Sequence, residues 1–298
     1  MNINRHHFLT IFITSIIFFS FSRTLLSQEA RPTGSSGRER LAVISKYKGQ
    51  VKVEHDTVLK TVTKIGNRIR NSSVYNEDTV LTMPVSMADL VFNDNTHLEV
   101  QEDTSLTIST RQITEEERAQ EGFIRKVAGT QKEVVRNISL KIGKIWANIT
   151  PSKSVLTEFE MPTGVATVRG TRCWIAHIVK TIIEVLVGEL GFLCDIGTAL
   201  LKKDTKIEVS VDKDKKVVTL KNIGKNPITI NDITFGKNST ISAGVTKEGI
   251  KVISTNGEVT RNGKDVKPGD SIDDDSGADD SGAVYGAQIL GEGGGGGG

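Results

Sequence analysis

Few side chains in this sequence have a spacing that would suit catalysis or metal binding. After the first 27 residues the histidines are His55, His97 and His177, and none stands in a nucleophile motif. The cysteines Cys173 and Cys194 are 21 positions apart with no paired histidines, which is not a zinc pattern. We therefore predict no catalytic residue, no metal site and no cofactor, and a protein that is not an enzyme.

Arg169, Gly170 and Thr171 could recognise a ligand or form a structural corner between two short apolar runs. In the corner interpretation the Arg169 guanidinium is buried and pairs with backbone carbonyls or Glu189, because an unpaired buried charge is costly. Gly170 would adopt a backbone conformation closed to other residues, and Thr171 would satisfy a backbone N–H. We favour the corner over a ligand contact, and it predicts that Arg169→Ala destabilises the fold.

The two cysteines leave two interpretations open. If the chain is exported to an oxidising compartment, Cys173 and Cys194 could form a disulfide. A simple hairpin of strands 172–179 and 182–187 does not place them opposite each other, so a bridge requires a further strand to stack back. Two buried free thiols are the alternative.

Short alternating runs dominate the chain from Leu41 onward and predict an all-β fold. Turn signals recur about every eight to twelve residues, which is typical of a sandwich, barrel or solenoid. Asp94-Asn95 indicates a hairpin, because both residues tolerate a positive φ. Thr114 and Glu117 have the spacing of a capping box and predict a short helical insertion over residues 115–128.

The N-terminus reads as an export signal. An apolar stretch over residues 8–21 follows Arg5 and ends before Arg23, too short to cross a bilayer, so we predict a signal cleaved after Ser27. An uncleaved membrane anchor is the alternative, and the only membrane contact we expect is through this segment.

Composition and charge divide the remaining chain and exclude some partners. We expect a disordered linker at 28–40, a β domain at 41–222, a second small β unit at 223–271, and a disordered Gly/Asp-rich tail at 272–298. Without the signal, Lys plus Arg falls from 38 to 36 and equals the 36 acids. A neutral chain with 5% aromatic residues is unsuited to nucleic acid.

Several motifs resemble those of the FecR domain family, over about residues 48–222. The most specific is Met161 to Thr171, MPTGVATVRGT, which is similar to the family's T-P-T-A-x-A-x-V-R-G-T run. GQVKV from Gly49, DTVLT from Asp78 and ADLVFNDNT from Ala88 resemble other family strands, although Glu77 and Asn95 replace usual glycines. The motif positions that we take as structural are Pro162, Thr163, Val168, Arg169, Gly170, Thr171, Gly188 and Glu189.

The resemblance implies a twisted β-solenoid or sandwich-like FecR module that is exported to the periplasm or cell surface. It implies a binding or scaffold protein of the envelope that contacts an envelope protein or glycan and takes part in cell-surface signalling. The seven residues before the apolar run are too few for the family's anti-sigma segment, so we expect no direct capture of a sigma factor. A structural, polysaccharide-associated surface protein is the alternative.

Overall fold

The computed structural model describes residues 39–113, 134–247 and 249–272, which all belong to one compact unit, Arg38–Gly298. The predicted export signal, the helical insertion at 115–128 and the Gly/Asp-rich tail lie outside these residues, apart from Ile272. Among the described residues there is no helix that is long and apolar enough to cross a membrane.

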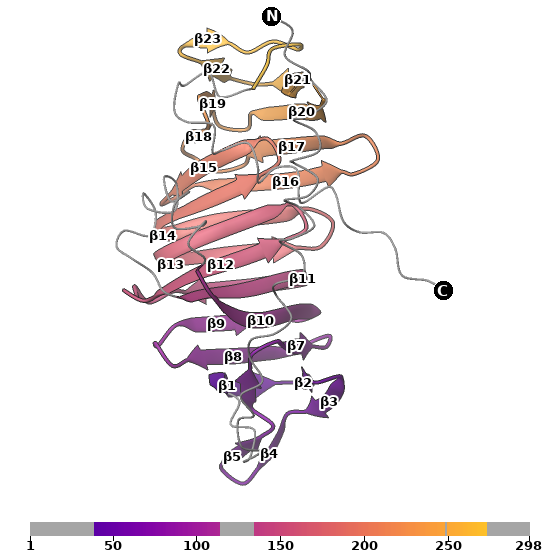
Figure 1. The fold of residues 1–298 in the computed structure, drawn as a ribbon, viewed down its shortest axis with the longest axis vertical. Helices are drawn as coiled ribbons and strands as arrows, with labels where there is room; N and C mark the ends of the chain where they lie inside the picture. Colours follow the sequence, from indigo (N-terminus) through magenta and orange to yellow (C-terminus); the bar gives the residue numbers. More distant parts are fainter. Residues whose placement is uncertain (1–38, 114–133, 248, 273–298) are drawn as a thin grey trace, which may run out of the picture. The chain divides into compact units, whose positions relative to one another are not determined.

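The described part of the chain consists of strands and turns and contains no helix, so the all-β prediction is confirmed (Figure 1). The strands are β1 (Arg40–Lys48), β2 (Val51–His55), β3 (Val58–Thr61), β4 (Thr63–Ile65), β5 (Arg68–Arg70), β6 (Ser73–Tyr75), β7 (Asp78–Thr82), β8 (Met87–Phe92), β9 (His97–Val100), β10 (Thr104–Gln112), β11 (Val134–Asn148), β12 (Val155–Met161), β13 (Gly164–His177), β14 (Thr181–Cys194), β15 (Gly197–Lys202), β16 (Lys206–Asp212), β17 (Val217–Asn222), β18 (Ile228–Ile230), β19 (Ile233–Phe235), β20 (Thr240–Thr246), β21 (Gly249–Asn256), β22 (Val259–Arg261) and β23 (Lys264–Asp265).

Backbone pairing arranges these strands in two ladders. Ladder A follows the order β3–β2–β7–β10–β11–β12–β13–β14–β15–β18–β19–β22–β23. Ladder B follows the order β6–β1–β8–β9–β11–β13–β14–β16–β17–β20–β21. Strands β4 and β5 form a separate hairpin. The long strands β11, β13 and β14 belong to both ladders and join them into one sheet that does not close.

Three glycines stand where the long strands pass from one ladder to the other. Strand β11 pairs with β10 up to Ile142 and with β13 of ladder B from Gly143, whose φ is +114°. The corresponding positions of β13 and β14 contain Gly170 and Gly188, with φ of +60° and +82°. Residues other than glycine rarely adopt such backbone angles. Glycine at these positions therefore allows each strand to bend and to continue in the other ladder.

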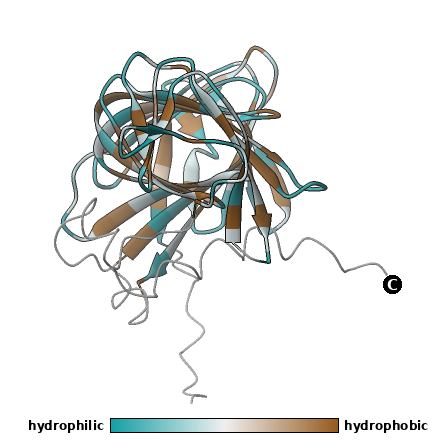
Figure 2. Cartoon of the chain, turned by 90° about the horizontal axis from the view of Figure 1, so that it is seen from above, coloured by the Kyte–Doolittle hydropathy of each residue, from teal (hydrophilic) through white to brown (hydrophobic). Residues whose placement is uncertain are grey.

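One apolar core includes side chains from both ladders, so the ladders pack against each other like the layers of a sandwich. Phe159 and Phe192 come from ladder A, Leu90 and Ile145 come from ladder B, and all four are fully buried. Figure 2 shows apolar and polar residues alternating along many strands, as expected when one face of a strand is buried and the other is exposed. This alternation is the physical basis of the periodicity in the sequence.

Both ladders continue past residue 222, where the sequence predicts a new unit. Strand β17 pairs with β20, and β15 meets β18 through Ala199 and Ile230. Ile230 and Ile241 belong to the same core as the earlier strands. In the structure, residues 223–272 extend the stack of strands that precedes them.

Candidate functional site

The Arg169-Gly170-Thr171 motif is a bulge within one continuous strand. The sequence suggests separate strands on either side of it, and this is wrong, because β13 runs unbroken through the motif. Arg169 pairs with Glu189 and Arg172 with Val187, so two residues of β13 face the single residue Gly188 of β14. A β-bulge of this kind bends the strand that contains the extra residue.

Close backbone approach explains the glycines of the corner. A Cβ atom on Gly188 would lie 2.9 Å from the carbonyl oxygen of Gly170, which is too close for any side chain. A Cβ on Gly170 would lie 2.7 Å from Cγ of Pro151. The predicted role of Gly170, a conformation closed to other residues, matches its φ of +60°.

The Thr171 side chain holds the two strands together at this corner. It is fully buried, and its hydroxyl donates to the backbone carbonyl of Glu189 at 2.6 Å, with the carbonyl of Arg169 at 3.1 Å. From the sequence we expect this hydroxyl to satisfy a backbone N–H. In the structure it donates to two carbonyls at the bulge instead.

Arg169 itself is exposed, which corrects the expectation of a buried guanidinium. The strand alternation that buries Val168 at 2% exposure directs its neighbour outward. Glu189, its backbone partner on β14, is half-buried, so a side-chain pair with the exposed Arg169 would be a partly solvated contact of little energetic weight. The motif is therefore held by Gly170, Thr171 and Gly188.

We therefore expect Arg169→Ala to change the free energy of unfolding by no more than about 0.5 kcal/mol, as is usual at exposed positions. Thr171→Val is the comparison variant, because it keeps the shape of the side chain but removes the buried hydroxyl. It should lower the free energy by about 1 kcal/mol or more. Urea denaturation followed by circular dichroism measures both, and a clear loss in Arg169→Ala would restore the buried-corner interpretation.

Two further motif positions, Pro162 and Thr163, lie in a turn between strands. Pro162 is exposed and Thr163 is buried in the turn between β12 and β13. The Thr163 and Thr181 hydroxyls are 2.5 Å apart, and Nδ1 of His177 lies 2.9 Å from the same Thr181 hydroxyl. Burial lowers the pKa of His177. This buried polar chain places His177 inside the fold, on the face opposite the outward Trp174.

Cys173 and Cys194 are separate buried thiols in the structure. Cys173 pairs across the strands with Val185, which lies nine positions before Cys194 on β14. That is roughly 30 Å of extended chain, whereas a disulfide requires Cα atoms within about 7 Å. Burial raises the pKa of each thiol from 9.0 to about 12. Neither is therefore a ready nucleophile at neutral pH.

The raised pKa values predict a loss of stability in alkali. Below pH 9 both thiols are protonated in the folded and unfolded states, so they add no pH dependence. Between pH 9 and 12 the unfolded chain releases these protons and the folded chain keeps them, so the free energy of unfolding falls as the pH rises. Each thiol contributes about 1.4 kcal/mol per pH unit.

Urea denaturation at pH 8 and pH 10 tests this, with a Cys173→Ala/Cys194→Ala double variant as the control. The native chain should lose about 3 kcal/mol more than the variant between the two pH values, because each of the two thiols contributes about 1.4 kcal/mol over the unit above pH 9. Equal losses would show that the thiols do not titrate differently in the two states.

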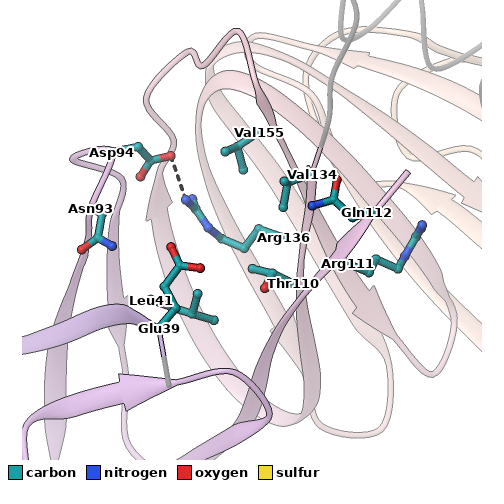
Figure 3. A pocket seen from close by; sticks show the side chains of 10 residues that line it. All are labelled: Glu39, Leu41, Asn93, Asp94, Thr110, Arg111, Gln112, Val134, Arg136 and Val155. Atoms are coloured by element: carbon teal, nitrogen blue, oxygen red, sulfur yellow. Dashed lines mark hydrogen bonds and ion pairs between the residues drawn. The ribbon is translucent and has the colours of Figure 1, made fainter. Parts of the chain in front are cut away.

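A hollow lies between the ladders, where strands begin or turn. It has a volume of about 320 Å³ and is drawn in Figure 3. The starts of β11 and β12 and the end of β10 form one wall, and the start of β1 with the β8–β9 turn forms the other. The lining residues are Glu39, Leu41, Asn93, Asp94, Thr110, Arg111, Gln112, Val134, Arg136 and Val155.

An ion pair between a buried arginine and a half-buried aspartate spans this hollow and connects the two ladders. Nη2 of Arg136 on β11 lies 2.8 Å from a carboxylate oxygen of Asp94 in the β8–β9 turn. The Arg136 side chain is 7% exposed, and its guanidinium also lies 4.2 Å from the ring centroid of Phe92. The other Asp94 oxygen accepts the backbone N–H of Thr96 at 3.1 Å and closes the turn.

Sequence reasoning identified the Asp94-Asn95 turn but missed Arg136. The signal was present, because Arg136 shares its strand face with the core residues Ile138 and Leu140. A charge at an inward position of a strand requires a partner. Only the fold places that partner 42 residues earlier in the chain.

A second polar pair that the sequence did not predict joins β2 to the start of β7. Nδ1 of His55 lies 2.5 Å from a carboxylate oxygen of Asp78, which is 1% exposed. The other Asp78 oxygen accepts the backbone N–H of Tyr75 at 2.8 Å, and the His55 and Tyr75 rings pack at 5.3 Å between centroids. Asp78 therefore closes the β6–β7 turn, as Asp94 closes the β8–β9 turn.

The described residues contain no cluster of three or more His, Cys, Asp or Glu side chains that could hold a metal ion. What they offer is a two-layer β framework with polar contacts at its edges and with exposed sheet faces.

The comparison with protein families finds one match. The family model described as "FecR protein" matches residues 78–190, from the first residue of β7 to Leu190 in β14. This stretch is a FecR domain, and the resemblance inferred from the motifs is confirmed. Glu77 and Asn95, which replace usual glycines, both keep a positive φ, of 69° and 62°, so the turns survive the substitutions.

Two solved structures are similar, and both are described as "a putative anti-sigma factor from Parabacteroides distasonis ATCC 8503". Each is 12% identical to this chain, and the match covers 44% of this chain and 54% of the solved chain with a TM-score of 0.34. This chain therefore spans about half the length of those structures. No curated protein matches it.

Proposed function

We propose that this protein is an exported FecR-type binding module that takes part in signalling at the cell surface through contact with an envelope protein. The observation that carries the proposal is the FecR match over residues 78–190, the central strands of both ladders. A regulator of this kind works by presenting a folded surface to other proteins. The protein has no enzymatic activity and requires no cofactor in this proposal.

The arrangement of the described residues supports a surface-binding role. Polar pairs such as Arg136 with Asp94 and His55 with Asp78 are used to join strands and close turns. The outward faces of both ladders stay available for a partner. The proposed location, outside the cytoplasm, rests on the apolar N-terminal run and on the family.

Site-specific photo-crosslinking in the native envelope tests the proposal. A photoreactive amino acid is introduced at Thr107 or Arg169, which lie on the outward face of ladder A within the matched stretch. Lys221, exposed on β17 outside that stretch, is the control position. We expect one discrete protein adduct from the matched positions and none from the control.

Two outcomes would contradict the proposal. Adducts with envelope polymer alone would favour the structural, polysaccharide-associated role. N-terminal sequencing that finds an intact Met1 in the cytoplasmic fraction would remove the export on which the signalling role depends.

A further inference from the structure

Both tryptophans of the chain lie side by side on the outward face of ladder B. Trp146 on β11 pairs directly with Trp174 on β13. Their sequence neighbours Ile145, Ala147 and Cys173 are buried in the core, so alternation directs both indoles outward, where they are half-buried. They are the only two tryptophans in the sequence.

Charged residues continue this line of cross-strand neighbours on both sides. Trp146 pairs with Glu99 of β9, which pairs with Asp89 of β8. Trp174 pairs with Glu184 of β14, which pairs with Lys206 of β16. We call this line the indole row: Asp89, Glu99, Trp146, Trp174, Glu184 and Lys206. Neighbouring strands are about 4.8 Å apart, so adjacent members of the row are within contact range.

The Trp174 half of the indole row is already neutralised within the chain. Nζ of Lys144 lies 4.3 Å from the centroid of the Trp174 ring, a cation–π contact. Glu184 forms an ion pair with Lys206 at 2.7 Å. In this half, one lysine lies over the outward indole and another pairs with the neighbouring carboxylate.

The Trp146 half has a similar composition, because Lys46 of β1 pairs across the strands with Asp89 as Lys206 does with Glu184, but here the lysine forms no ion pair with the carboxylate. Asp89 and Glu99 stand directly opposite each other, although like charges at this position destabilise a sheet. Among the described residues neither carboxylate forms an ion pair, and no cation lies over the Trp146 ring. Glu99 accepts one hydrogen bond from the side chain of Gln101. Arg172, exposed and diagonal to Trp146, is not placed over its ring.

We propose that Trp146, Glu99 and Asp89 are a docking point for an arginine side chain of a partner protein. A guanidinium stacks on an indole face and donates to carboxylates from its edge, so one arginine uses both features at once. Its charge would relieve the repulsion between Asp89 and Glu99. The inference rests on the proposed function, because it names the chemistry of the protein partner.

The two tryptophans make the test direct. In a ¹⁵N-labelled chain they give two indole N–H signals, which Trp146→Phe and Trp174→Phe assign. On titration with a tetra-arginine peptide at low salt, we expect the Trp146 signal to shift in a saturable way and the Trp174 signal to shift less. Tetra-lysine should bind more weakly, because an ammonium is more strongly hydrated and cannot stack.

Charge variants separate this site from general attraction of a cationic peptide. Glu99→Gln should weaken the binding of tetra-arginine about two- to five-fold, the range of an exposed charge pair or cation–π contact. Glu160→Gln is the matched control, because Glu160 is exposed on the outward face of ladder A and loses the same charge. It should leave the affinity within about 1.5-fold. Lys144→Gln should leave the Trp146 shift in place.

Other occupants of this face would overturn the proposal. A Trp146 shift with hydroxyethylcellulose and none with tetra-arginine would indicate a neutral polysaccharide. A Trp146 shift on dilution of the chain alone would indicate a second copy of the chain. Equal weakening in Glu99→Gln and Glu160→Gln would mean that no docking point exists here. These failures would leave the proposed function standing, which is tested separately by the envelope cross-links from ladder A.

Discussion

Replacement of Gly143 by alanine is expected to lower the free energy of unfolding by about 3 kcal/mol, because backbone strain and overlap act together. Gly143 is the residue at which β11 passes from ladder A to ladder B, and its φ is +114°. A Cβ atom there would lie 2.5 Å from Cβ of Thr104 and closer still to its Cα and hydroxyl. That hydroxyl accepts the backbone N–H of Lys144 at 3.0 Å, so the strand cannot move away freely.

Gly66→Ala is the matched control. Gly66 also has a positive φ, of +59°, but nothing lies within 4 Å of an added Cβ. Only the conformational cost remains there, about 1 kcal/mol. Urea denaturation of both variants measures the difference. Equal losses would mean that the passage between the ladders tolerates a side chain and that Gly143 is not required by the close approach.

Asp94→Asn is expected to lower the free energy of unfolding by roughly 2 to 3 kcal/mol, because it leaves the Arg136 guanidinium buried without a counter-charge. Arg136 is 7% exposed and Asp94 is 21% exposed, so the remaining arginine has little access to water. Asparagine keeps the oxygen that accepts the Thr96 N–H, so the turn itself is preserved. The loss then reports mainly on the charge.

A double-mutant cycle provides the control for this pair. Arg136→Met keeps apolar bulk against Phe92 and removes the buried cation. Replacing both partners should recover most of the loss and give a stability within about 1 kcal/mol of the native chain. Additive losses in the double variant would show that the 2.8 Å contact between the ladders contributes little to stability.

The sequence predicted the strands well because each strand buries one face. The alternation in β7, β8 and β14 is the direct record of which side chains enter the core. Asp94-Asn95 marked its hairpin because few residues accept the positive φ of a tight turn. These signals are local, and local signals can be read without knowing what packs against them.

The predictions about Arg169 failed because burial depends on the neighbouring strand. Its place between apolar runs suggested a buried side chain, but β13 continues through the motif, and the alternation that buries Val168 directs Arg169 outward. The predicted break between two strands at this motif was also wrong, because a β-bulge and a turn use similar residues and look alike in the sequence. Register between β13 and β14 is a property of two segments and cannot be read from one.

The pairing of Trp146 with Trp174 is another feature that a single segment of the sequence does not reveal. They are 28 positions apart in sequence, and nothing in either local run indicates that they pair. The carboxylates of Glu99 and Asp89 come from two further strands. Only the lateral order of ladder B brings the four residues into one line.

The amino-acid sequence by itself determined the all-β class, the turns and the FecR motifs, because these follow from side-chain alternation and from residues that permit special backbone angles. The tertiary structure alone decided that three long strands serve both ladders, that Arg136 meets Asp94, and that the indole row exists. Each of these depends on pairing between segments far apart in the chain, and such pairing is fixed by packing against a shared core.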